Sequence, residues 1–148
     1  SVWAMIDTET RRPCDLVTLY DGDLLNYVVS DEENVCPIEG HGRFRFRDAQ
    51  LVRTLTTCYS DIDINGHVNS IKYIEHILNL FSRQQMERGI KRFEIAYKAE
   101  SYMGDTLSFY VQPVDDNEID VEVRKNISED SNGDVVCQAK VRFNVSDE

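Results

Sequence analysis

The longest helical pattern in the sequence covers residues 68–88, and it follows a short strand pattern at residues 50–58. Its apolar side chains recur at helical spacing and form a wide stripe: Ile71, Ile74, Ile77, Leu78 and Phe81, broadened by Tyr73 and Leu80. A stripe of this width predicts a helix that is largely buried. Asn69 or Ser70 can cap its start, and Gly89 can end it. Any fold of this chain must therefore enclose one long helix.

After the helix, the pattern changes to strands. Four segments have the alternation or the β-branched content of strands: residues 91–101, 106–113, 118–127 and 134–145. The last two are joined through Asn132-Gly133, which is a strong hairpin signal. Residues 50–145 thus predict one strand, a buried helix and four more strands. A single helix wrapped by an antiparallel sheet is the economical packing for that order, so the expected fold class is α+β.

The residues before this pattern are less regular. We expect a short strand over residues 1–7 and one or two short helices over 14–29. Residues 30–42 are acidic and then rich in Pro and Gly, which predicts a connecting loop, and 43–47 alternate Arg with Phe, as in a short strand or an extended linker. Because the chain opens on a strand pattern without an initiator Met, we expect it to be a piece of a longer protein.

Composition narrows the class of protein. The chain has 148 residues, enough for one ordinary domain, and 41% of them are hydrophobic. A net charge of −11 argues against a general affinity for nucleic acid or for anionic membranes. No apolar run approaches the length of a membrane span. The four Cys form no CxxC pair, so we expect reduced thiols and a cytoplasmic location.

Polar residues are concentrated where the strand pattern ends and the helical pattern begins. Between Asp61 and Asn69 the chain has two acids, two Asn, one Gly and one His. The spacing Asp-x-Asp-x-Asn-Gly matches the first half of an EF-hand loop, but Lys72 stands where that loop needs a bidentate Glu. His67 has no second ligand at zinc spacing, because His76 lies well along the helix. We therefore expect no metal.

The residue types in this cluster suit catalysis. A His transfers protons near neutral pH, a carboxylate orients it or activates water, and an Asn amide can hold the water or polarise a carbonyl. A second carboxylate can come from Glu100, which the alternation places at the end of a strand on its polar side. The alternative is a polar helix entry in which Asp63 or Asn65 caps the backbone and His67 is structural.

The sequence resembles the acyl-ACP thioesterases of plants and bacteria. The resemblance rests on residues 59–74, Tyr-Ser-Asp-Ile-Asp-Ile-Asn-Gly-His-Val-Asn-Ser-Ile-Lys-Tyr-Ile. It continues in Trp-Ala-Met-Ile-Asp at residues 3–7, Thr-Arg-Arg-Pro at 10–13 and Ile-Ala-Tyr-Lys-Ala-Glu-Ser at 95–101. The family implies two hotdog domains in tandem, each a long helix wrapped by an antiparallel sheet. Residues 1–7 would then be the last strand of a mostly absent first hotdog, 8–49 the interdomain linker and 50–148 the C-terminal hotdog.

By this resemblance, the catalytic residues are Asp63, Asn65, His67 and Glu100. Plant members have Cys directly after the Glu, whereas this chain has Ser101, which argues against a Cys–His mechanism. We expect His67 to be held by a carboxylate and Glu100 or Asp63 to activate water. Direct attack by a carboxylate stays an alternative.

The family implies hydrolysis of acyl-ACP in fatty acid biosynthesis, in the cytoplasm of a bacterium. The expected partner is an acyl carrier protein with a fatty acyl chain, and the expected contacts between domains are hotdog–hotdog pairing or a homodimer. No nucleotide, flavin or nicotinamide motif is visible, so no cofactor is expected. The rival hypotheses are an acyl-CoA thioesterase of the same fold and a non-catalytic acyl-binding hotdog.

Overall fold

The structure is a computed structural model that describes residues 5–10, 12–29, 39–40, 42–44, 46–128 and 131–145. The chain divides into two compact units, Ser1–Gly40 and His41–Glu148. In the first unit, the helical pattern expected over 14–29 is a 3-10 helix, η1, Leu16–Tyr27. Its N-cap is Asp15, whose carboxylate accepts a hydrogen bond from the Val17 amide at 2.9 Å. Of the strand expected over 1–7, residues 1–4 lie outside the described residues, and Ile6 makes only an isolated bridge with Pro13.

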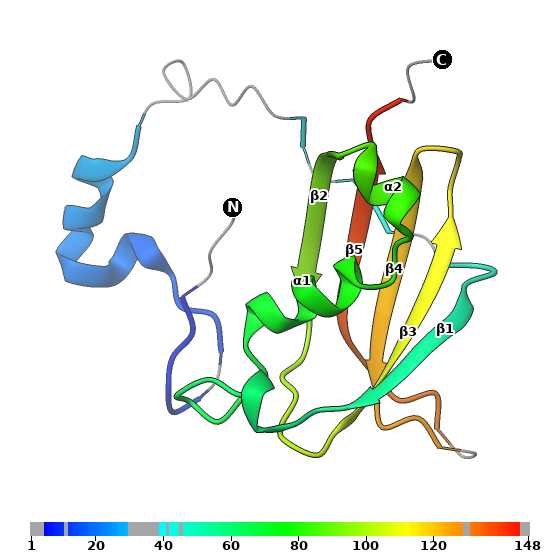
Figure 1. The fold of residues 1–148 in the computed structure, drawn as a ribbon. Helices are drawn as coiled ribbons and strands as arrows, with labels where there is room; N and C mark the ends of the chain where they lie inside the picture. Colours follow the sequence, from blue (N-terminus) through cyan, green and yellow to red (C-terminus); the bar gives the residue numbers. More distant parts are fainter. Residues whose placement is uncertain are drawn as a thin grey trace. The chain divides into compact units, whose positions relative to one another are not determined.

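The second unit is built on a five-stranded antiparallel sheet in the order β1-β3-β4-β5-β2 (Figure 1). The strands are β1 Gln50–Thr56, β2 Ile90–Tyr97, β3 Thr106–Pro113, β4 Glu118–Lys125 and β5 Asp134–Phe143. All five were predicted, and the hairpin between the last two is confirmed by the antiparallel pairing of β4 with β5. Gly133 has φ of +67°, as the turn signal at this position requires.

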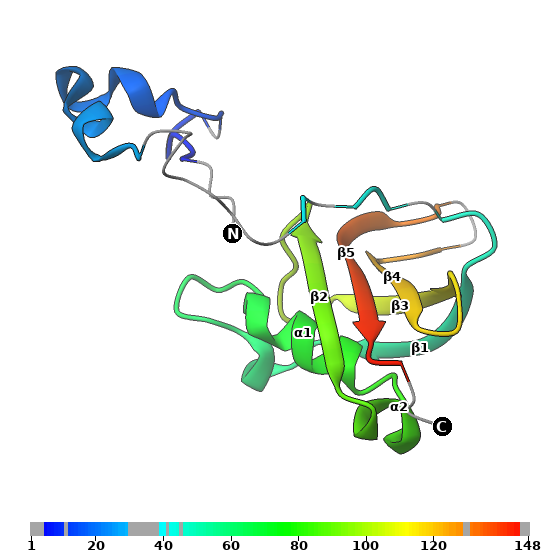
Figure 2. The same cartoon turned by 90° about the horizontal axis from the view of Figure 1, so that it is seen from above.

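The core lies between one face of the sheet and the helix α1, Ser70–Leu78. Figure 2 shows α1 in the curve of the sheet. Tyr73 and Ile77 of the helix meet alternate residues of the three central strands: Leu107, Phe109, Val121, Val123, Cys137, Ala139 and Val141. These side chains are all buried because strand residues with a period of two share a face. The α+β prediction of a helix enclosed by an antiparallel sheet is thus confirmed.

The predicted single helix over 68–88 is wrong in its length. Helix α1 ends at Leu78, and a second helix, α2, covers Arg83–Glu87. Between them, Ser82 starts α2 with a capping box, in which its side chain accepts from the Gln85 amide and the Gln85 side chain accepts from the Ser82 amide. The apolar stripe continues across the break because Phe81 still packs on Phe143 of the core, with ring centroids 5.2 Å apart.

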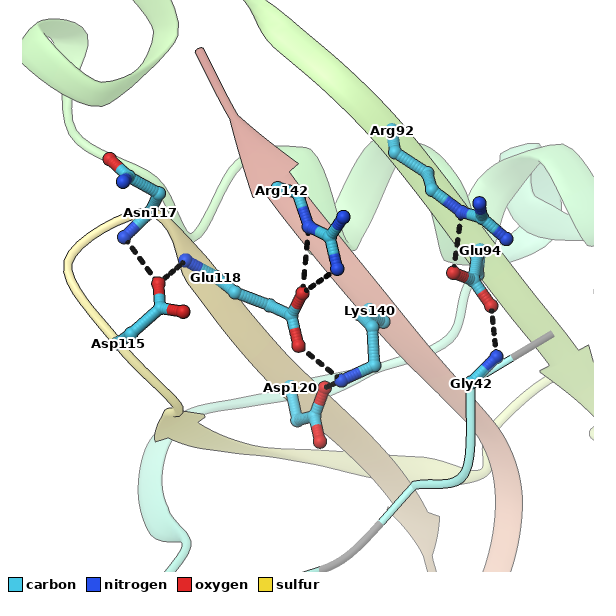
Figure 3. Close-up of polar contacts among 9 residues, drawn as sticks. All are labelled: Gly42, Arg92, Glu94, Asp115, Asn117, Glu118, Asp120, Lys140 and Arg142. Atoms are coloured by element: carbon cyan, nitrogen blue, oxygen red, sulfur yellow. Dashed lines mark hydrogen bonds and ion pairs between the residues drawn. The ribbon is translucent and has the colours of Figure 1, made fainter. Parts of the chain in front are cut away.

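The opposite face of the sheet carries charges that neutralise one another. Glu118 on β4 is held by Lys140 and Arg142 on β5, each at 2.6 Å, and Lys140 also lies 2.9 Å from Asp120 (Figure 3). Burial acts to raise the pKa of Glu118, but the two cations outweigh it and the pKa lies below its usual value. The predicted alternation of β4 therefore separates an apolar face from a face of paired charges.

Residues 42–44 and 46–48 pack against this charged face. The Gly42 amide donates to Glu94 Oε2 at 3.1 Å (Figure 3), and the Arg47 and Asp48 amides both donate to Gln112 Oε1. None of these six residues is in a strand, so the short strand considered for residues 43–47 is not found at the described positions of that run. A Cβ at Gly42 would lie 3.3 Å from Lys140 Cε, so a side chain here would require Lys140 to shift by a few tenths of an ångström. Among the described residues, no helix is long and apolar enough to cross a membrane.

Candidate functional site

The polar cluster forms a tight turn between the end of β1 and the start of α1. After the short 3-10 helix η2, Tyr59–Asp61, the Asp63 amide donates to the His67 carbonyl at 2.8 Å, and the Gly66 amide donates to the Asp63 carbonyl at 3.1 Å. Gly66 has φ of +83°, a conformation that side-chain-bearing residues rarely adopt. The turn thus depends on glycine and on hydrogen bonds of its own backbone.

The Asp63 carboxylate holds the backbone of this turn and does not hold the imidazole ring of His67. Its Oδ1 accepts hydrogen bonds from the Asn65 amide at 2.8 Å and from the His67 amide at 3.3 Å. A carboxylate that bonds to amides two and four residues later fixes the local backbone, as in an Asx turn. Asp63 therefore fixes the backbone position from which the His67 side chain extends. Asn65 is exposed on the turn.

His67 pairs with Glu100. His67 Nε2 lies 3.5 Å from Glu100 Oε2, with the two side chains 30% and 44% exposed. A backbone hydrogen bond of 2.8 Å from the Val68 amide to the Ser101 carbonyl joins the turn to the segment that carries Glu100. Of the two carboxylates that the sequence offered as partners of the imidazole, the structure places Glu100 beside it.

The alternation predicted Glu100 at the end of the strand, but the residue lies beyond the end of β2. The strand ends at Tyr97, and the amides of Lys98 and Ala99 both donate to one carbonyl, that of Val136, at 2.8 and 3.3 Å. Two consecutive amides on one acceptor mark a bulge, which interrupts the alternation of side chains. Glu100 consequently reaches the helix side of the sheet, where His67 lies.

A pocket of about 220 Å³ opens at this pair. It is lined by residues of the turn, of α1, of β2 and of the segment after β2: Asp63, His67, Val68, Ser70, Tyr73, Tyr97, Ala99 and Glu100. Burial raises the pKa of Tyr73 to about 12, so this hydroxyl stays neutral at physiological pH. The Tyr97 hydroxyl donates to the Ser70 carbonyl at 2.9 Å. Three of the four predicted site residues line the pocket, and Asn65 does not.

Two residues that the sequence had not singled out also contact the pair. The Tyr102 hydroxyl donates to Glu100 Oε2 at 3.3 Å, and its ring meets the His67 ring edge-on with centroids 5.1 Å apart. Lys125 Nζ, at the end of β4, donates to the Glu100 carbonyl at 2.7 Å. Tyr102 could have been suspected because residues two apart in an extended segment share a side. The contact of Lys125 follows from strand register, which the sequence does not display.

Ser101 lies behind the pocket. Its side chain is fully buried, and it does not line the pocket, so the hydroxyl is not presented to a substrate. A second histidine–carboxylate pair is more deeply buried. His76 Nε2 is 3.2 Å from Asp61 Oδ1, and the two side chains are 17% and 7% exposed. Within the described ranges, no three His, Cys, Asp or Glu side chains are arranged to hold a metal ion.

The geometry suits acid–base chemistry on a neutral electrophile. A carboxylate beside an imidazole can take a proton from water and return it to a leaving group. A partly open pocket with aliphatic and aromatic walls gives an apolar group room next to that pair.

An antiparallel sheet curved around one helix, with this junction at the helix start, defines a hotdog domain. The model of the acyl-ACP thioesterase C-terminal domain matches residues 46–145, and the chain belongs to this family. It is 34% identical over 104 residues to a chloroplastic palmitoyl-acyl carrier protein thioesterase of Arabidopsis thaliana, and 32% identical over 114 residues to a chloroplastic dodecanoyl-[acyl-carrier-protein] hydrolase of Cinnamomum camphora. These alignments cover 68% and 72% of this chain but 25% and 29% of the relatives.

Two solved structures extend the comparison. An acyl-ACP thioesterase from Bacteroides thetaiotaomicron superposes with a TM-score of 0.79 and 49% identity, over 94% of this chain and 53% of that one. The 12:0-ACP thioesterase from Umbellularia californica superposes with a TM-score of 0.68 at 20% identity, which bears on the fold. The chain thus spans about half the length of these two structures.

Proposed function

We propose that this chain carries the catalytic residues of a thioester hydrolase that releases a free fatty acid from acyl carrier protein. The observation that carries the proposal is the approach of His67 Nε2 to Glu100 Oε2, 3.5 Å, at the wall of a pocket. Membership of the acyl-ACP thioesterase family supports the substrate class. Hydrolysis of acyl-ACP in this way would serve fatty acid biosynthesis.

In the proposed reaction, Glu100 and His67 together remove a proton from a water molecule in the pocket. The resulting hydroxide attacks the thioester carbonyl carbon, and the carbonyl oxygen becomes an oxyanion. When the C–S bond breaks, the thiolate of the carrier leaves and takes the proton from His67, so that acid and thiol are the products. Asp63 holds the His67 amide, whereas the role of Asn65, on the water or on the thioester carbonyl, rests on the motif alone because Asn65 does not line the pocket. Catalysis by Asp63, Asn65, His67 and Glu100 remains a prediction of the motif.

We also propose the arrangement of the whole protein. Residues 1–7 would complete a preceding hotdog, residues 8–49 would link it, and residues 50–148 would be the second hotdog. Strand β2 lies at an edge of the sheet, where its outer backbone groups can pair with another hotdog of the same chain or with a second copy. The absence of a CxxC pair supports a location where thiols stay reduced, and we propose the bacterial cytoplasm.

The test is hydrolysis of a panel of acyl-ACPs by the purified protein, with matched acyl-CoAs alongside and detection of the free thiol. We expect release from acyl-ACPs that exceeds release from the matched acyl-CoAs. Preference for the CoA esters would contradict the proposed carrier but keep the reaction. Tight binding of acyl chains without release of thiol, by folded protein, would instead establish an acyl-binding module.

A further inference from the structure

Tyr102 touches both side chains of the proposed site at once. Its hydroxyl reaches the Glu100 carboxylate at 3.3 Å, and its ring meets the His67 ring at an interplanar angle of 76°. An edge-to-face contact of this kind restricts the plane of an imidazole without occupying either of its nitrogens. The hydrogen bond that Tyr102 donates to Glu100 Oε2 likewise restricts the orientation of the carboxylate.

The backbone of Tyr102 is itself fixed by buried or bonded neighbours. Its amide donates to Asp105 Oδ2 at 2.9 Å, and its carbonyl accepts from Thr57 Oγ1 at 2.6 Å. Thr57 is only 3% exposed, so this anchor belongs to the interior of the domain. The Asn126 side chain holds the other Asp105 oxygen at 3.1 Å. Tyr102 therefore starts from a rigid turn, although its side chain is 48% exposed.

A cation completes the arrangement. Lys125 Nζ lies 5.8 Å from the centroid of the Tyr102 ring and donates to the Glu100 carbonyl. The ring thus contacts both a cation and an imidazole, and both neighbours limit its rotation. The turn, the end of β4 and the site are joined through this one aromatic side chain.

We propose that Tyr102 is a positioning residue of the site, which aligns His67 with its ring and Glu100 with its hydroxyl. The assignment rests on the proposed hydrolysis for its kinetic consequences, and on the contacts alone for its structural ones. The separation of the two roles is testable because Phe keeps the ring and loses the hydroxyl, whereas Leu loses both.

The kinetic experiment compares kcat and KM of Tyr102→Phe and Tyr102→Leu with those of the wild type in acyl-ACP hydrolysis. We expect Tyr102→Phe to lower kcat about 3- to 10-fold and to keep KM within about twofold. The effect is moderate because the lost hydrogen bond is half-exposed, although its acceptor is a carboxylate. We expect Tyr102→Leu to lose about tenfold more, since it also releases the His67 ring.

The matched control is Tyr110→Phe on β3. Tyr110 also has a cation over its ring, Arg124 at 5.5 Å, but it lines no part of the pocket. We expect this variant to keep the kcat and the KM of the wild type. The proposal is overturned if both Tyr102 variants, at equal folded fraction, keep the kcat of the wild type. A rise in KM alone would also overturn it, because it would make Tyr102 a substrate contact.

A second measurement separates this proposal from the proposed function. The ring of Tyr102 should shift the NMR resonances of the His67 ring protons, which the His67→Ala variant assigns. We expect those shifts to persist in Tyr102→Phe and to be lost in Tyr102→Leu. If the wild type hydrolyses no thioester, the proposed function fails while this measurement still decides the positioning. Identical His67 resonances in all three proteins would refute it.

Discussion

The two histidine–carboxylate pairs of this domain differ in what surrounds them. His67 and Glu100 lie at the wall of a pocket, 3.5 Å apart and both partly exposed. His76 and Asp61 lie 3.2 Å apart in the interior, where the His76 ring also meets Phe109 edge-on at 6.2 Å between centroids. The same two chemical groups are thus open to a substrate in one place and enclosed in the other.

The enclosed pair is occupied by structural hydrogen bonds. Asp61 Oδ2 accepts from the Cys58 amide at 2.8 Å and from Cys58 Sγ at 3.3 Å, while Oδ1 faces His76. The Asp61 carbonyl also accepts from the Asn69 amide at 2.8 Å. Asp61 therefore ties the end of β1 to both ends of the turn and to α1. The open pair, by contrast, adjoins a pocket, and from this difference we propose chemistry for one pair and a structural role for the other.

The strongest test of the difference between the two pairs is to remove the imidazole of the open pair. We expect His67→Ala to lower kcat for acyl-ACP hydrolysis by about 100- to 10,000-fold, because it removes the proton-transfer group. The temperature of unfolding should stay close to that of the wild type, since the ring is partly exposed. The matched control is His76→Gln, for which we expect lower stability but near-normal turnover per folded molecule. Normal turnover in His67→Ala would assign the chemistry elsewhere.

The next effect concerns Asp63, which acts on the open pair through the backbone. We expect Asp63→Ala to lower kcat by about 100-fold, because two amides of the turn lose their acceptor and His67 loses its fixed position. Asp63→Asn keeps an oxygen for those amides and loses the charge. A mild defect in Asp63→Asn beside a severe one in Asp63→Ala would mean that the turn matters most. Equal, severe defects would mean that the charge itself takes part in the reaction.

The enclosed pair should matter to stability rather than to chemistry. We expect Asp61→Ala to lower the free energy of unfolding by about 3 kcal/mol, because it leaves the Cys58 amide and the largely enclosed His76 ring without their partner. Urea unfolding measures this directly. Asp61→Asn, which keeps an acceptor, is expected to lose less. If Asp61→Ala unfolded at the urea concentration of the wild type, the pair would not tie the turn to the helix.

The same pair should contribute to acid sensitivity. Burial acts to raise the pKa of Asp61, but hydrogen bonds from Cys58 and His76 outweigh it, so the pKa lies below its usual value of 3.8. The folded state then binds fewer protons, and this contribution to stability is complete above the unfolded pKa and lost as the pH falls through the folded one. We expect the stability gap between wild type and Asp61→Asn to shrink below about pH 4. A gap that stays constant down to pH 2 would contradict the lowered pKa.

Much of the domain was predictable because its strands alternate clearly. Every strand of the second unit was predicted from its pattern, and Asn132-Gly133 predicted the hairpin. The break between α1 and α2 was missed because the apolar stripe runs on through Phe81, although Ser82 and Gln85 carry a capping signature. Local patterns thus located the elements, whereas the end of a helix inside a continuous apolar stripe can be located only from the capping residues of the next helix.

The site was less predictable because tertiary geometry decides it. The turn from Asp61 to Asn69 was evident from its composition, but the choice of Glu100 rather than Asp63 as the partner of His67 depends on a bulge after β2. No pattern in the sequence displays that bulge. The same holds for the Lys125 contact, which depends on the register of β4 with its neighbours.

The smallest expected effect is that of Ser101→Ala, and it sharpens the contrast between open and enclosed groups. Ser101 directly follows Glu100, but its side chain is fully buried, and its carbonyl holds the Val68 amide whatever the side chain is. We expect kcat within about threefold of the wild type and stability within about 1 kcal/mol, since only one buried hydroxyl is lost. A loss of kcat as large as that of His67→Ala would make Ser101 the nucleophile. Such a result would require the segment after β2 to turn its buried side outward during catalysis, and it would transfer the chemistry from the open pair to a residue behind it.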